Sequence, residues 1–327
     1  MEEKQYVSES YSDGSTGSGK WTKVLRFSFV ILAFFFLCRY FYRNIDTYRN
    51  LEVHIDSGVF FIAFIFHLIY KIMQALLWHY ITILNNCGIK IQNAVLTYFY
   101  SILGKYIPGK VFMLLARIPA YEDEGVSASK VTVCFFVENV CTLLGAAFLF
   151  IVSLLFIPNN VFTEYRWCVA LVIFGFAVCI NPRIINFFLR IVEKFLKKSL
   201  QIPMSYGQMI KVVTLFVLNW IVLGVGFYML ICSIYPIEPS NLLYVSGVFG
   251  LSVIIGILAL FAPSGLGVRE GVMILGLSAV MPQEYAVLIS VVSRLWMTIS
   301  ELITVGLAWL IGLFIKRRTA RDRGDRS

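Results

Sequence analysis

The sequence predicts an all-α protein that crosses a membrane several times and contains two broken or re-entrant helices. Of its 327 residues, 59% are hydrophobic and 14% are charged, a composition too apolar for one water-soluble core. Several apolar runs reach about 20 residues, the length that a helix needs to cross a bilayer. Two other apolar stretches are interrupted by proline, glycine and charged residues, and such breaks are tolerated only where protein or a watery cavity satisfies the freed backbone.

Seven apolar runs are the predicted spans, and they divide the chain into a membrane domain with two polar ends. The runs are 24–42, 58–84, 130–157, 166–181, 211–235, 243–262 and 284–315. Segments 95–116 and 266–282 are apolar but broken, and we expect half-length or re-entrant helices there. Residues 1–23 lack an apolar face and predict a disordered tail. Residues 24–315 then form the transmembrane domain, and 316–327 form a basic tail.

The distribution of lysine and arginine predicts the orientation, because these residues are retained on the cytoplasmic side. They gather before residue 24, in 85–130, in 182–211 and after residue 315, whereas the alternate loops hold only Arg43 and Arg49. Both termini are therefore expected in the cytoplasm, with the protein in the cytoplasmic membrane. The first broken segment then enters from the cytoplasm. The second forms a hairpin with 243–262 and enters from outside, which predicts an inverted repeat.

Several functional classes find no support in the sequence. The net charge of +9 lies in loops and ends rather than on one soluble face, so no nucleic-acid partner is expected. The seven cysteines and three histidines lack the spacing of a metal site. The glycines and lysine of 14–20 have the spacing of a phosphate-binding loop, but Trp21 stands where Ser or Thr should bind magnesium. We therefore expect no cofactor, no metal and no catalytic residue.

Ionisable residues inside the predicted spans are candidate cavity or gate residues, because a charge at this depth is costly. Lys71 shares a helix face with His67 and Gln74. It lines a cavity or forms a structural pair with a carboxylate, for which Glu138 is the best candidate. Arg294 and Glu301 lie two turns apart on one face. They meet partners on other helices or line the cavity of the broken segments, and we favour the cavity.

The two broken segments predict an anion site. The first contains Pro108 and Gly109, and the second contains Pro263, Gly265 and Gly267. Helices that begin at such breaks present free N–H groups and a positive dipole end, which attract phosphate or carboxylate.

Charged residues accompany both breaks, namely Lys105, Lys110 and Arg269. Together they suit the anionic headgroup of a phospholipid or polyprenyl phosphate. The alternative is that the lysines only set topology and the glycines only allow close packing.

These segments carry a resemblance to a known family. Residues 100–110 with Arg117 and Glu138, followed by the Pro-x-Gly-x-Gly-x-Arg-Glu pattern of 263–270 and by Arg294, resemble the lysylphosphatidylglycerol synthase transmembrane family. This is the flippase-like membrane domain of the multiple peptide resistance factor, and the resemblance covers about residues 20–315. It implies a helical fold that moves a lipid or lipid-linked headgroup. The soluble aminoacyltransferase domain of the full-length factors has no counterpart here, so we expect no aminoacylation by this chain.

The leading hypothesis is therefore a translocase for an anionic phospholipid or a lipid-linked saccharide in cell-envelope biogenesis. Its predicted headgroup-binding residues are Lys105, Lys110, Arg117 and Arg269, and its predicted cavity or gate residues are Lys71, Glu138, Glu270, Arg294 and Glu301. Intramembrane carboxylates permit proton coupling. The alternatives are an enzyme acting on a lipid phosphate, and a membrane subunit that holds a separate transferase. Oligomers are compatible with each.

Overall fold

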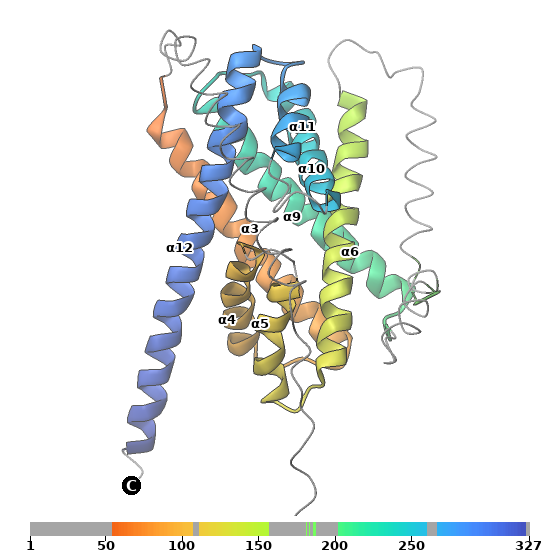
Figure 1. The fold of residues 1–327 in the computed structure, drawn as a ribbon, viewed down its shortest axis with the longest axis vertical. Helices are drawn as coiled ribbons and strands as arrows, with labels where there is room; N and C mark the ends of the chain where they lie inside the picture. Colours follow the sequence, from red (N-terminus) through yellow and green to blue (C-terminus); the bar gives the residue numbers. More distant parts are fainter. Residues whose placement is uncertain are drawn as a thin grey trace, which may run out of the picture.

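The computed structural model describes residues 54–106, 111–156, 202–259 and 267–324, together with residues 181, 183, 186 and 187. This part of the chain is helical and contains no strand. The elements are α3 (Ser57–Leu84), α4 (Ile91–Ile102), η1 (Leu103–Tyr106), α5 (Val111–Glu122), α6 (Ala128–Ser153), η2 (Leu154–Phe156), α9 (Tyr206–Cys232), η4 (Pro239–Asn241), α10 (Leu242–Leu258), α11 (Val268–Leu277) and α12 (Gln283–Gly324). Figure 1 shows their arrangement.

Five helical segments are long and apolar enough to cross a membrane, which confirms a multi-pass helical protein. They are Ser57–Leu84, Ala128–Ser153, Tyr206–Cys232, Pro239–Leu258 and Gln283–Ile315, and each overlaps a predicted span. The predicted spans 24–42 and 166–181 lie outside the described residues, apart from residue 181, and so does the predicted tail 1–23. Helix α12 continues past the predicted end of its span to Gly324.

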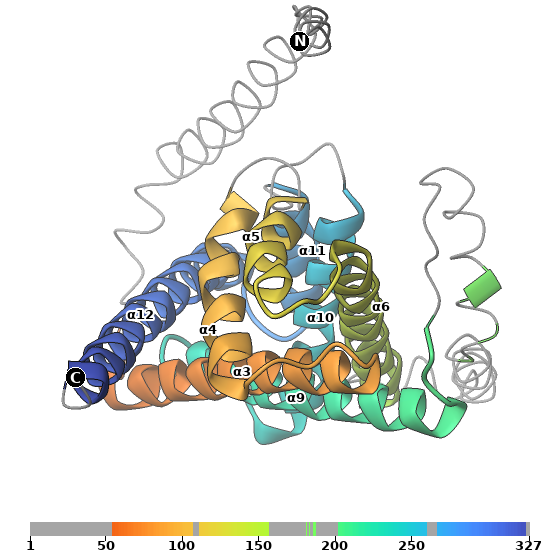
Figure 2. The ribbon, with the colours of Figure 1, turned by 90° about the horizontal axis from the view of Figure 1, so that it is seen from below.

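Helices α3 and α9 pack along each other in opposite directions. The backbone N–H of Asp56, just before α3, donates to the carbonyl of Ser233, just after α9, at 2.9 Å. Polar caps fix where both helices begin: the Asp56 side chain accepts from the first turn of α3, and Ser205 with Gln208 forms a capping box on α9. In Figure 2, α3 and α9 lie along one side, α12 and α6 flank them, and α4, α5, α10 and α11 lie between.

The first broken segment forms a re-entrant hairpin, as predicted for 95–116. Helices α4 and α5 have 12 residues each, so each is about 18 Å long and too short to cross a bilayer of about 30 Å. Near the open end of the hairpin, Asn93 Nδ2 donates to Glu124 Oε1 at 3.1 Å. The chain therefore returns to the end from which it entered, with η1 at the tip.

The second broken segment also turns back, as a hairpin of α10 and α11. Helix α11 has 10 residues, about 15 Å. The hydroxyl of Tyr244, at the start of α10, donates to the carbonyl of Gly276, at the end of α11, at 2.9 Å. In Figure 1, α10 and α11 lie in the upper half and α4 and α5 lie in the lower half. The hairpins thus enter from opposite ends of the molecule, which is the inverted relation that the loop charges predict.

The tip of the first hairpin depends on a glycine. A Cβ on Gly104 would lie 2.7 Å from the backbone nitrogen of Met113 and 2.8 Å from the carbonyl carbon of Phe112. Backbone atoms cannot rotate away as a flexible side chain can. We expect Gly104→Ala to cost about 1–3 kcal/mol, as overpacking does.

The melting temperature of the purified protein in detergent tests this prediction. The matched control is Gly306→Ala, because a Cβ there meets nothing within 4 Å. A Gly104→Ala protein as stable as the control would show that the tip is loosely packed.

Candidate functional site

A buried carboxylate on α12 lies at the centre of the candidate site. Glu301 is 1% exposed, and its Oε1 lies 2.9 Å from Lys71 Nζ of α3. Its Oε2 forms a second ion pair with Lys105 of η1. Glu301 lies about 27 Å along α12 from Gln283 and about 21 Å from Ile315. The tip of the first hairpin therefore reaches a charged group near the middle of the last span.

A second carboxylate stabilises the tip of the second hairpin. Gly267 has φ +82°, a backbone conformation that favours glycine, and its N–H donates to Glu270 Oε2 at 2.6 Å. The other oxygen of Glu270 forms an ion pair with Arg294 of α12. Glu270 thus satisfies a backbone group at the start of α11, and Arg294 balances its charge. Helix α11 begins directly after Gly267.

Arg269 lies beside this pair and packs on uncharged groups. Its guanidinium carbon is 4.8 Å from the centre of the Phe249 ring, and Nη2 donates to the Met297 sulfur at 2.9 Å. Within the described part of the chain, no carboxylate forms an ion pair with Arg269. It is close enough to interact electrostatically with Glu270, Glu301 and Arg294.

Together these residues form what we call the central cluster, and it carries excess positive charge. Its members are the cations Lys71, Lys105, Arg269 and Arg294 and the carboxylates Glu270 and Glu301. The cluster thus brings together four cations and two carboxylates. Charge in a low-dielectric interior requires a counter-charge. The cluster is therefore suited to an anion.

A second buried pair lies apart from this cluster. Arg117 of α5 is completely buried, and its Nη1 donates to Glu138 Oε2 of α6 at 2.5 Å. Its Nε donates to Ser101 Oγ at 2.9 Å. The guanidinium also packs on the rings of Trp78 and Tyr98, at 4.1 and 4.6 Å from their centres. This arrangement is what a structural ion pair requires, because every buried charge has a partner.

The expected pairing of Lys71 with Glu138 is therefore wrong. The face of α3 that carries Lys71 is directed towards α12, while Glu138 of α6 is directed towards α5. Headgroup binding by Arg117 would require its pair with Glu138 to separate. Of the remaining predicted site residues, Lys110, Pro108, Gly109, Pro263 and Gly265 lie outside the described residues.

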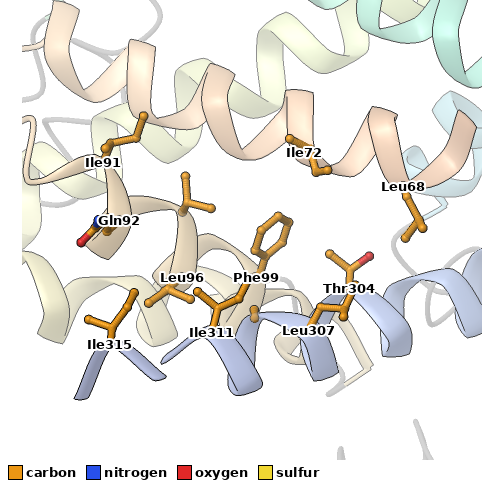
Figure 3. A pocket seen from close by; sticks show the side chains of 12 residues that line it. Leu68, Ile72, Ile91, Gln92, Leu96, Phe99, Thr304, Leu307, Ile311 and Ile315 are labelled. Atoms are coloured by element: carbon orange, nitrogen blue, oxygen red, sulfur yellow. The ribbon is translucent and has the colours of Figure 1, made fainter. Parts of the chain in front are cut away.

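An apolar groove lies between α3, α4 and α12 and ends beside the central cluster. Its volume is about 400 Å³, and Figure 3 shows its lining: Leu68, Ile72, Ile91, Gln92, Val95, Leu96, Phe99, Thr304, Leu307, Ala308, Ile311 and Ile315. Ile72 follows Lys71 in the chain, and Thr304 lies one turn after Glu301. Ile91, Gln92 and Ile315 line the opposite end in Figure 3. We call this the α3–α4–α12 groove.

Several contacts of the site have no recognisable signal in the sequence. Phe249 and Met297, which hold Arg269, have no feature that separates them from other apolar residues of the spans. Within the described residues, no three His, Cys, Asp or Glu side chains lie together so that they could bind a metal ion.

Comparison with known proteins identifies the family. The family described as "Lysylphosphatidylglycerol synthase TM region" matches residues 23–311, which include both hairpins and the central cluster. No curated protein matches the chain. The chain therefore belongs to the lysylphosphatidylglycerol synthase transmembrane family, and it is a multi-pass helical membrane protein of a family associated with lipid metabolism or transport.

Proposed function

We propose that the protein translocates an anionic phospholipid or a lipid-linked saccharide across the cytoplasmic membrane, with both termini in the cytoplasm. One observation carries the proposal: two hairpins from opposite ends bring Lys105 and Arg269, both partly exposed, to a cluster of four cations around the buried carboxylates Glu270 and Glu301. A polar headgroup cannot cross the bilayer interior without such a site, because its desolvation is costly.

In this proposal Lys105 and Arg269 contact the phosphate. Arg269 is suited to the task because a guanidinium donates several hydrogen bonds and its present contacts are a ring and a sulfur. Lys110, close to the first tip in sequence, is assigned the same role. Lys71 and Glu301 hold the first tip, while Glu270 and Arg294 hold the second.

The α3–α4–α12 groove supports a lipid substrate rather than a free anion. Its lining is almost wholly apolar, and it begins next to Lys71 and Glu301. A molecule with a phosphate and a long hydrocarbon chain would find a charged site and an apolar surface in continuity. An inorganic anion would use only the charged site.

We expect Arg269→Gln to slow translocation by about tenfold or more, because a charged hydrogen bond contributes about 1.5–3 kcal/mol. The purified protein is reconstituted into liposomes with headgroup-labelled phosphatidylglycerol, and dithionite quenches the label in the outer leaflet. Quenching beyond half of the label reports translocation.

Lys211→Gln is the matched control, since Lys211 lies over the Tyr80 ring and outside the central cluster. A neutral phosphatidylcholine probe tests headgroup charge. Quenching that stops at half for wild type with both probes, and with a labelled lipid-linked sugar, would contradict the proposal. Equal translocation rates for wild type and Arg269→Gln would show that Arg269 does not bind the headgroup.

A further inference from the structure

A buried histidine adjoins the central cluster and has no role in the proposed headgroup contacts. His67 of α3 is 0% exposed, and neither ring nitrogen has a hydrogen-bond partner in the described part of the protein. Its ring meets the Trp296 ring edge-on, with centroids 4.8 Å apart. Buried polar atoms are nearly always hydrogen-bonded, so two unsatisfied nitrogens on one side chain call for an explanation.

The charges that interact with His67 come from four elements, α3, η1, α11 and α12. Lys71 lies one turn further along α3, and Glu301 of α12, Lys105 of η1 and Arg269 of α11 are close enough to interact electrostatically with the imidazole. Tyr70 packs against it, with ring centroids 5.7 Å apart.

The other helices packed on α3 direct their charges elsewhere. Lys211 of α9 lies over the Tyr80 ring, about 20 Å further along α3 than His67. Glu138 of α6 is paired with Arg117. Around His67, three cations therefore face one carboxylate.

This excess of cations around His67 links the protonation of His67 to the occupancy of the anion site. With the site empty, a proton on His67 would add a fourth cation to the group, which is unfavourable. A bound phosphate brings negative charge to the same cations and removes that penalty. The proton on His67 and the phosphate in the cluster therefore each strengthen the binding of the other. This coupling is reciprocal by thermodynamic necessity.

We propose that His67 is a proton-binding site that takes up a proton when an anionic lipid headgroup enters the central cluster. A lone pair on one imidazole nitrogen accepts the proton from water, and the proton leaves when the headgroup leaves. One proton then accompanies each headgroup, so a proton gradient biases the direction of lipid movement. This inference rests on the proposed function, since it requires the headgroup to occupy the cluster.

The test uses the full-length protein in liposomes with headgroup-labelled phosphatidylglycerol, at pH 6 and pH 8 and with an imposed pH gradient. Wild type is expected to translocate at least about fivefold faster at pH 6, because histidines commonly change charge in this interval. The gradient is expected to shift the steady-state distribution of the lipid between leaflets. In His67→Gln, translocation persists, while the pH response and the gradient effect disappear.

The matched control is His79→Gln, a partly exposed histidine three turns further along α3 and outside the cluster. It should keep the wild-type pH response. His67→Leu gives a second variant, and melting temperatures verify that each protein is folded. If wild type translocates but His67→Gln retains its pH and gradient responses, the coupling is overturned and the proposed function stands. If wild type does not translocate at either pH, both are overturned.

Discussion

Replacing Glu301 by alanine is expected to destabilise the protein by about 3–5 kcal/mol, the range measured when one partner of a buried ion pair is removed. Glu301 is the shared counter-ion of Lys71 and Lys105. Without it, Lys71, which is buried, and Lys105, which is partly exposed, lose the carboxylate that they share. The first hairpin tip is expected to withdraw from α12, because hydration then stabilises the Lys105 ammonium group more than its position beside α12 does.

A stability measurement in detergent, by thermal melting or by titration with a denaturing detergent, checks this expectation. Glu284→Ala, an exposed carboxylate in the first turn of the same helix, is the control. A triple variant with methionine at Lys71, Lys105 and Glu301 should recover much of the lost stability, because it removes the stranded charges. A Glu301→Ala protein as stable as Glu284→Ala would show that water already reaches these lysines.

The pair of Arg117 and Glu138 is expected to give the second large effect. Arg117→Met leaves a buried carboxylate, and Glu138→Met leaves a buried guanidinium, so each change should cost about 3–5 kcal/mol. The double variant should cost less than the sum of the two, since neither charge is then stranded. Arg117→Met should be the more harmful single change, because it also removes the contacts with Trp78 and Tyr98.

A double-mutant cycle on melting free energies gives the coupling between the two side chains. The matched cycle combines Lys71→Met with Glu138→Met, which belong to different ion pairs. Their effects should add, within about 0.5 kcal/mol. Additive effects for Arg117 with Glu138, or strong coupling for Lys71 with Glu138, would contradict the observed pairing.

The features that the sequence predicts correctly are those with a local cause. A span is visible as a continuous apolar run, and a re-entrant hairpin is visible as a break inside such a run. The opposite entry of the two hairpins follows from loop charges on either side of them, and Figure 1 shows the hairpins at opposite ends, each closed by a hydrogen bond near its open end. Each of these properties can be read from a short stretch of the chain.

The partners of the buried charges have no such local cause. Glu301 meets lysines from α3 and η1, and nothing near any of the three residues specifies the others. Arg117 follows a broken segment, which favours a headgroup role, but the aromatic side chains around it come from other helices. The shared face of His67, Lys71 and Gln74 is predicted by spacing. What that face meets, such as the Tyr98 hydroxyl that donates to Gln74 at 2.9 Å, depends on packing.

The opposite hairpins have a consequence for the permeability of the membrane. Each hairpin returns to its own end, and both reach the central cluster. In the proposed transport, one hairpin would stay against α12 while the other withdraws. A cycle in which the two hairpins open in strict alternation would admit a headgroup from one side and release it on the other without opening a continuous path for small ions.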